Sequence, residues 1–147
     1  CRCTIGEVRR YLGRISEPLL DRMDLCVETK APAFSLSRGE GSECSQVMKE
    51  RVVQAVERQR RRYEKESFSY NGEIPDSMVK KYCPLGREQA DFLEEFYQQV
   101  SMRQIFKIIR VGKTIADLRG SDEIQGEDLA EAVCMRSINK QYWGGNE

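Results

Sequence analysis

An apolar face at helical spacing between Met102 and Leu118 constrains the fold of this chain more than any other feature. Its apolar residues recur three and four positions apart, which is the period of a helix with one buried side. Ser101 is a favoured N-cap before the segment, and Gly120 is a favoured stop after it. We therefore predict a central helix whose buried face consists of Ile105, Ile108, Ile109, Gly112, Ile115 and Ala116.

Similar patterns predict helices through most of the region that follows residue 44. The capping and breaking residues that bound them are Ser, Asp, Gly and Pro, which favour helix ends. A mostly helical bundle follows from this repetition. The predicted helices are a long one starting near Ser45 with Val47, Val52, Ala55, Val56 and Gln59 along one side, a short one from Asp76 to Tyr82, one from Gly86 to Val100, and a closing one from Ile124 to about Asn139.

The first part of the chain follows a different pattern. Thr4 can cap a helix that runs to about Gly13, with Val8, Tyr11 and Leu12 on its inner face. A second short helix opens at Ser16, and Pro18 lies in its first turn, where a missing N–H costs nothing. The next four residues, 25–28, are Leu-Cys-Val-Glu, whose apolar and β-branched character predicts a short buried strand.

A stretch rich in Pro, Gly and Ser separates these two regions and has no hydrophobic period. We place a linker at residues 36–44, which divides an N-terminal segment at 1–35 from a helical domain at 45–140. The last residues, 141–147, also lack a period and are predicted to be a disordered tail.

Composition excludes several kinds of site. The chain has 24 basic and 24 acidic residues, so its net charge gives no general attraction to nucleic acid. It has no histidine, which removes Ser/His/Asp and Cys/His catalytic sites and imidazole metal ligands. No apolar run approaches the roughly 20 residues that a membrane span needs. The six cysteines are scattered, apart from the first two, and indicate reduced thiols and a cytoplasmic location.

Cys1 and Cys3 could supply half of a four-thiolate zinc site. Two thiolates cannot complete a tetrahedral shell, so the other two ligands would have to lie upstream. We therefore expect no zinc in this chain alone, and stoichiometric metal in a purified sample would contradict that expectation.

Two further segments carry candidate phosphate-binding residues. Arg58, Arg60, Arg61 and Arg62 could follow a DNA backbone, or they could form a solvated helix end that Glu57, Glu64 and Glu66 compensate. The sequence Gly112-Lys113-Thr114 resembles the end of a phosphate-binding loop. The first glycine of that motif should be at position 107, which is Lys107, and no strand precedes it. We therefore place these residues in the middle of a helix, where Gly112 permits close packing.

The segment before the strand resembles one family. The matching run includes Cys1, Cys3, Thr4, Gly6 and Tyr11, and continues as Arg-Ile-Ser-Glu-Pro-Leu-Leu-Asp-Arg-Met-Asp-Leu over residues 14–25. This run is similar to the end of the ATPase core in magnesium-chelatase-like AAA+ proteins of the ComM/YifB group. The pattern Ser-x-Arg at 101–103 and Thr-Ile-Ala-Asp-Leu at 114–118 is similar to the helical lid of the same proteins.

This resemblance implies a fold and a set of roles. The fold would be mainly α, the helical lid bundle of an AAA+ ATPase with a short helix-strand remnant of its αβα core. Arg22 would be an arginine finger acting on a neighbouring subunit, Arg103 would contact ATP phosphates at the sensor-2 position, and Arg110 is a second, less favoured candidate for that contact. The parent protein would use ATP and Mg²⁺ and would form a ring, a hexamer.

The resemblance also implies DNA remodelling during recombination and transformation. Two alternatives remain open, namely a metal-chelatase-like motor that acts on a protein partner and a helical protein-interaction module. The sequence supplies no phosphate loop and no strand ending in paired acids. We therefore expect this chain by itself to bind no ATP and to be catalytically inactive.

Overall fold

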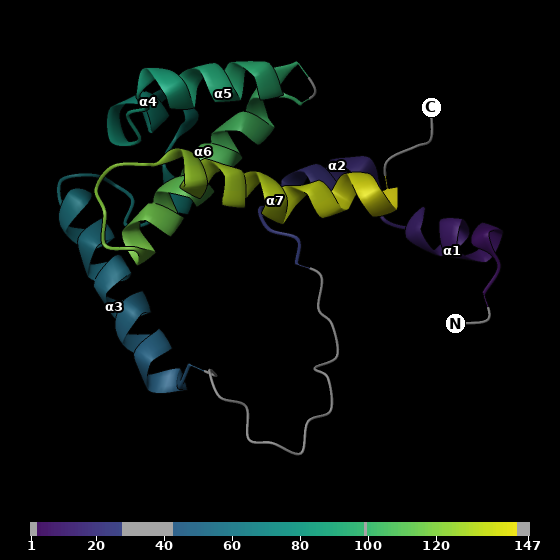
Figure 1. Cartoon of the computed structure of the whole chain (residues 1–147), viewed down its shortest axis with the longest axis horizontal. Helices are drawn as coiled ribbons and strands as arrows, with labels where there is room; N and C mark the ends of the chain where they lie inside the picture. The colour runs from purple at the N-terminus through teal and green to yellow at the C-terminus, as the bar shows by residue number, and fades with distance from the viewer. Residues whose placement is uncertain (1–2, 28–42, 99, 144–147) are drawn as a thin grey trace.

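The structure is a computed structural model, and it describes residues 3–27, 43–98 and 100–143. Within these ranges the chain is helical and has no β-strand, so the predicted mainly α fold class is confirmed. Figure 1 shows α6 and α7 at the centre, with α3 extending at one end and α1 at the other. The helices are α1 (Ile5–Leu12), α2 (Glu17–Arg22), α3 (Ser45–Arg62), η1 (Asn71–Glu73), η2 (Asp76–Met78), α4 (Val79–Tyr82), α5 (Arg87–Tyr97), α6 (Met102–Leu118) and α7 (Gly126–Trp143).

The central helix α6 has the bounds and the caps that the sequence predicts. The Ser101 side chain accepts a hydrogen bond from the Gln104 backbone N–H at 3.3 Å. Gly120 has a φ of 83°, a left-handed conformation that glycine adopts without strain. The predicted apolar face is also confirmed: Ile115 is half-buried, and the residues that are buried are Ile105, Ile108, Ile109, Gly112 and Ala116.

Gly112 allows α7 to approach α6 closely. A Cβ atom at this position would lie 2.9 Å from Cδ2 of Leu129, which is fully buried. Glycine within a helix costs about 1 kcal/mol relative to alanine, and here the contact with α7 accounts for its presence. The predicted packing role of Gly112 is therefore confirmed.

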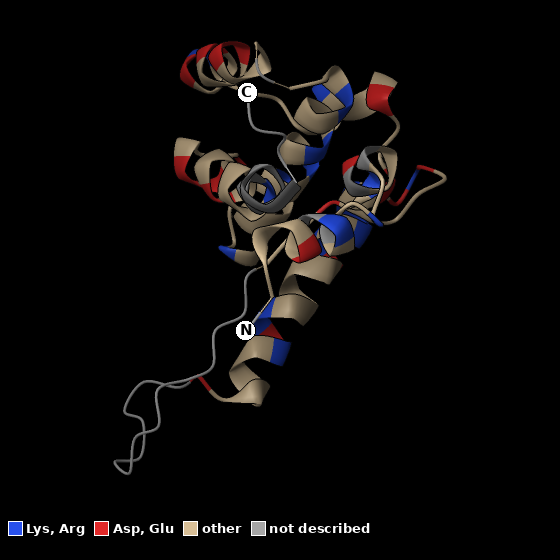
Figure 2. Ribbon diagram, turned by 90° about the vertical axis from the view of Figure 1, so that its right-hand side faces the viewer, with Lys and Arg blue, Asp and Glu red and all other residues tan. Residues whose placement is uncertain are grey.

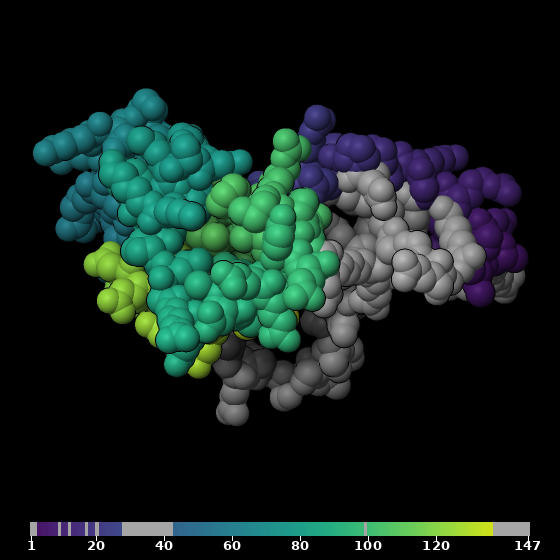
Figure 3. All heavy atoms as spheres, turned by 90° about the horizontal axis from the view of Figure 1, so that it is seen from above, coloured from purple at the N-terminus to yellow at the C-terminus, as the bar shows by residue number. Residues whose placement is uncertain are grey.

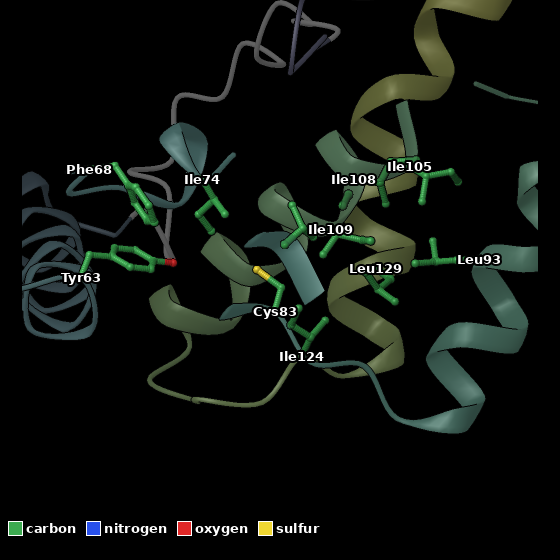
Figure 4. Close-up of a cluster of buried hydrophobic side chains, with 12 residues drawn as sticks. Tyr63, Phe68, Ile74, Cys83, Leu93, Ile105, Ile108, Ile109, Ile124 and Leu129 are labelled. Carbon is green, nitrogen blue, oxygen red and sulfur yellow. The ribbon is translucent and has the colours of Figure 1, made fainter. Parts of the chain in front are cut away.

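An apolar core joins α6 to α4, α5, α7 and the end of α3 (Figure 4). Leu129 and Ala132 of α7 and Leu93 of α5 pack against the isoleucines of α6. At the other end of the core, the Tyr63 ring lies 5.0 Å from the Phe68 ring and 5.1 Å from the Tyr82 ring, between centroids. These tilted and edge-on contacts are the arrangement that aromatic rings favour. They attach the end of α3 to the segment before α4, through Phe68, and to the last residue of α4, Tyr82.

The strand predicted at 25–28 is wrong for its described residues, 25–27. Leu25 is 52% exposed and Val27 is 70% exposed, and neither belongs to a strand. A strand needs a neighbouring strand to pair its backbone groups, and the described ranges offer none. The Cys26 N–H instead donates to the backbone carbonyl of Met135 in α7 at 2.8 Å. Glu28 lies outside the described residues.

Two predicted buried faces are also wrong in part. On α1, Val8 and Tyr11 are 41% and 69% exposed, so the described residues do not bury them as predicted, and the Leu12 side chain lies outside what the structure describes. The cap of α1 is as predicted, since Thr4 and Glu7 exchange backbone and side-chain hydrogen bonds. On α3, Val47 and Val52 are exposed, because the first half of the helix extends beyond the bundle (Figure 1). The buried part of the predicted α3 face is limited to Ala55 and Gln59.

The chain ends differ from prediction in one respect. Helix α7 continues to Trp143, past the predicted end near Asn139 and into the predicted tail. Residues 144–147 and residues 28–42, which include positions 36–42 of the predicted linker, lie outside the described residues. No helix in the described ranges is long and apolar enough to span a membrane.

The buried Cys83 thiol gives a testable pH dependence. Burial raises its pKa from the ordinary value of 9.0 to about 11. Between these values the unfolded thiol loses its proton while the folded thiol keeps it, so the free energy of unfolding falls as pH rises. A shift of this size corresponds to a loss of about 2–3 kcal/mol. Urea denaturation at pH 8 and pH 11 should show that the free energy of unfolding falls less between these two pH values for Cys83→Ala than for the unmodified chain.

Comparing the two chains isolates the thiol from other groups that titrate at high pH. Burial also raises the pKa of Tyr63 to about 12, so ionisation of this tyrosine lowers stability above pH 10 in both chains. Equal losses with and without Cys83 would contradict the prediction.

Candidate functional site

Arg22 is the last residue of α2. The helix begins as predicted, because the Ser16 carbonyl accepts a hydrogen bond from the Leu19 N–H at 3.0 Å and Pro18 lies in the first turn. The Arg22 side chain is exposed and makes no hydrogen bond or ion pair with another described residue. The guanidinium donors are therefore not used by the part of the chain that the structure describes.

Arg103 lies in the first turn of α6. Its side chain is also exposed, and it likewise has no hydrogen-bond or ion-pair partner among the described residues. The positive end of the helix dipole is at this terminus, so the helix itself does not favour a cation there. An external anion would satisfy both the arginine and the helix terminus.

The two arginines lie at the ends of helices that contact each other. The Gln104 side-chain amide donates to the Asp21 carboxylate at 2.8 Å, and Lys107 Nζ donates to the backbone carbonyl of Arg22 at 2.6 Å. Figure 3 shows this N-terminal segment beside the green surface contributed by α6. Arg22 follows Asp21 and Arg103 precedes Gln104, so the hydrogen bond between Asp21 and Gln104 involves a sequence neighbour of each arginine. The two arginines are 81 positions apart in the sequence.

Arg110 differs from these two residues. Its Nη2 atom donates to the Ile74 carbonyl at 2.6 Å and pairs with the Asp76 carboxylate. Its side chain is only 14% exposed. The guanidinium that the sequence ranked as the weaker phosphate candidate is thus engaged within the chain.

The basic run at the end of α3 has partners that the sequence does not indicate. Arg62 makes a two-pronged contact with Asp117, with N–O distances of 2.6 and 2.9 Å. Arg58 pairs with Asp122 at 3.1 Å. The acids of the predicted solvated alternative, Glu57, Glu64 and Glu66, take no part in the ion pairs that the structure gives these arginines. In the same run, Arg60 and Arg61 are exposed.

Asp117 is the centre of a buried polar cluster that joins α3, η1 and α6. Besides Arg62, it contacts Lys113 Nζ at 3.3 Å and the Asn71 side-chain amide at 2.8 Å. Lys113 is 1% exposed and also donates to the Asp122 carbonyl at 2.8 Å. The resemblance of Gly112-Lys113-Thr114 to a phosphate loop is therefore only local, because the lysine lies mid-helix and is bound inside the fold.

The neighbouring charges and hydrogen bonds favour the ionised form of Asp117. Burial alone would raise the pKa of Asp117, but hydrogen bonds from Arg62 and Asn71 and the charge of Lys113 keep that pKa below its ordinary value. Burial lowers the pKa of Lys113, and the charge of Asp117 opposes this change. The cluster is a network of partnered charges within the fold.

Figure 2 shows Lys, Arg, Asp and Glu residues distributed over several helices. Basic and acidic residues are equal in number in the sequence, which gives the chain no net charge. Of the candidate zinc ligands, Cys1 lies outside the described residues and Cys3 is exposed. Within the described ranges, no group of three or more acidic or cysteine side chains is placed to hold a metal ion.

Sequence reasoning missed the residues that connect distant segments. Asp117 and Asn71 carry the buried cluster, and Lys107 and Gln104 hold the end of α2. A buried face containing Asp and Lys four residues apart is one available signal for the cluster. No pattern in the sequence points to a contact between Lys107 and Arg22.

Comparison with known families decides the relationship. A model described as magnesium chelatase, subunit ChlI C-terminal, matches residues 42–136, which is more than half of the chain. This chain belongs to the magnesium chelatase ChlI family. A second model of the same family, described as magnesium chelatase, subunit ChlI, matches residues 1–36. The resemblance found in the sequence is confirmed.

Relatives of this ChlI family chain occur in several bacteria. It is 36% identical to the YifB protein of Salmonella typhimurium over 143 residues, covering 95% of the chain and 28% of YifB. It is 35% identical over 143 residues to YifB of Escherichia coli, with the same coverage, and 35% identical over 141 residues to the competence protein ComM of Haemophilus influenzae, covering 93% of the chain and 27% of ComM. The chain thus spans little more than a quarter of the length of these relatives.

Proposed function

We propose that this chain supplies the cationic residues of a ring-forming AAA+ ATPase. In this proposal, Arg22 is the arginine finger for ATP bound by a neighbouring subunit, and Arg103 contacts ATP phosphates at the sensor-2 position. The observation that carries the proposal is the exposure of both guanidinium groups without a partner among the described residues, at the junction of α2 and α6.

The chemistry of arginine suits this role. Phosphoryl transfer develops negative charge on the transferred group and the leaving oxygen, and a planar guanidinium can donate two hydrogen bonds to such oxygens. The described residues offer neutralising acids to Arg58, Arg62 and Arg110, but not to Arg22 or Arg103. Bound ATP and Mg²⁺ would supply the reacting phosphate and its counter-charge. The residues that hold them would belong to a phosphate loop that this sequence lacks.

The proposed setting is a ring, in which each subunit presents Arg22 to the next. We further propose that the motor acts on DNA, by analogy with the relative named as a competence protein. Arg60 and Arg61, which are exposed, are then the first candidates in this chain for contact with a phosphate backbone. Stimulation of ATP hydrolysis by single-stranded DNA would support this part. Its absence would favour a motor that acts on a protein.

The experiment that tests the proposal measures ATP hydrolysis by a full-length protein that contains this chain and a nucleotide-binding core. We expect hydrolysis that requires Arg22 and assembly of several subunits. A protein that hydrolyses ATP equally well with Arg22→Ala, or only as a monomer, would contradict the proposal.

Arg103 gives a separate prediction. In the same full-length protein, Arg103→Ala should weaken ATP binding by about tenfold, the effect of losing roughly 1.4 kcal/mol of charge-assisted hydrogen bonding. Equilibrium titration with a fluorescent ATP analogue would measure this change. Arg10→Ala is the matched control, because Arg10 is also exposed but lies on α1. Equal weakening by both variants would exclude a specific role for Arg103.

A further inference from the structure

The short segment after α2 is held by side chains from α6. Lys107 Nζ donates to the Arg22 backbone carbonyl at 2.6 Å and pairs with the Asp24 carboxylate at 2.9 Å. The Lys107 side chain is only 13% exposed, whereas the Asp24 side chain is 65% exposed. One turn before Lys107, the Gln104 amide donates to Asp21 at 2.8 Å. Helix α6 therefore contacts the residues on both sides of Arg22 as well as Arg22 itself.

A second set of contacts comes from α7. Arg136 is 8% exposed, and its Nη1 atom donates to the carbonyl of Met23 at 2.6 Å and to the carbonyl of Asp24 at 3.3 Å. The preceding residue, Met135, accepts a hydrogen bond from the Cys26 N–H at 2.8 Å through its backbone carbonyl. The Arg136 guanidinium is thus bound to the backbone that follows α2.

These contacts have a clear physical purpose at a helix end. The last carbonyls of a helix have no partner within it, and a cationic side chain can satisfy them while complementing the negative end of the dipole. Lys107 does so for the carbonyl of Arg22, the last residue of α2, and Arg136 binds the two carbonyls that follow the helix. Consecutive carbonyls at residues 22, 23 and 24 are thus bound by two side chains that are themselves largely buried.

We propose that Lys107 and Arg136 are positioning residues for Arg22. They fix the backbone of Arg22 and hold it in one position relative to α6, the helix whose first turn contains Arg103. A rotation of α6 would therefore carry the end of α2 with it. This inference rests on the proposed function for its effect on catalysis, but the contact itself can be tested without nucleotide.

The first test measures hydrogen exchange in this chain. Lys107→Met and Arg136→Met should each speed exchange of the Cys26 amide and its neighbours by tenfold or more. Residues 51–62 of α3 serve as an internal reference, because general destabilisation would speed their exchange too. Lys107→Arg, which keeps a donor and a charge, should restore protection. Lys49→Met replaces an exposed lysine on α3 and is the matched control. Unchanged exchange at residue 26, or an equal rise in α3, would overturn the proposal.

The second test is a double-mutant cycle in the full-length protein. Lys107→Met should lower kcat for ATP hydrolysis at least tenfold with little change in KM, because the finger would be misplaced while ATP binding is intact. In an Arg22→Ala background, the same change should have no further effect, since Lys107 acts through Arg22. Additive losses in the two backgrounds would overturn the positioning role.

The two proposals fail in different ways. If Arg22→Ala leaves ATP hydrolysis unchanged, the proposed finger is wrong, whatever the exchange data show. If Arg22→Ala abolishes hydrolysis while Lys107→Met retains the full kcat, the finger stands and the positioning role is wrong.

Discussion

Replacing Arg22 by alanine in the full-length protein is expected to lower kcat for ATP hydrolysis by about 10³-fold or more, the effect typical of removing an arginine finger. The side chain is exposed, so its removal should not disturb the fold of this chain. A finger that acts only as charge develops should leave the affinity for ATP nearly unchanged. Steady-state hydrolysis and equilibrium nucleotide binding, measured on the same preparation, would test both expectations.

Mixed assemblies make this prediction sharper. Because Arg22 is proposed to act on a neighbour, Arg22→Ala subunits should regain hydrolysis when mixed with subunits that keep Arg22 but cannot bind ATP. Arg14→Ala is a suitable control, since Arg14 is exposed and close in sequence but lies before α2. Failure of the mixture to recover activity would contradict action between subunits, and a similar loss with Arg14→Ala would contradict the assignment to Arg22.

Replacing Asp117 by alanine is expected to destabilise this chain by about 3–5 kcal/mol, the usual cost of removing one partner from a buried ion pair. The variant would leave Lys113, whose side chain is 2% exposed, without the carboxylate that compensates its burial. Arg62 and Asn71 would lose the same partner. Urea denaturation at pH 7 should show a lower midpoint with an unchanged slope.

Asp122→Ala is the matched control for Asp117→Ala. Asp122 also contacts Arg62, at 3.4 Å, but its side chain is 75% exposed, so its loss should cost less than about 1 kcal/mol. Adding Lys113→Met to Asp117→Ala should recover part of the stability, because it removes the unpaired buried charge. A cost for Asp117→Ala no larger than that of the control would show that the cluster does not stabilise the fold.

The arginines differ in how far the sequence could predict their surroundings. The family resemblance points to Arg22 and Arg103, and the structure places both on the surface at the contact between α2 and α6. Arg62 was grouped with its neighbours in a basic run, but its partner Asp117 is 55 positions away. A linear charge pattern carries no information on such a contact.

Much of the secondary structure could be predicted because its causes are local. The bounds and buried face of α6 depend on residues within a few turns, on Ser101 as a cap and on Gly120 as a stop. The strand at 25–28 was predicted from composition and failed, because strand formation depends on a partner strand. The predicted burial of the apolar faces of α1 and α3 was wrong in part for a similar reason. A periodic apolar face shows only that a helix can be buried, and the burial itself depends on other elements.

By itself, the sequence determined the helical class, the caps of α1 and α6, the mid-helix position of Lys113 and the family resemblance. The tertiary structure alone decided which charges are internal and which face outward. Asp117 collects three polar partners from α3, η1 and α6, and Lys107 and Arg136 hold the backbone around Arg22. The physical reason is that periodicity and capping act within a few residues. Charge pairing depends on distances that are set only when remote helices pack together.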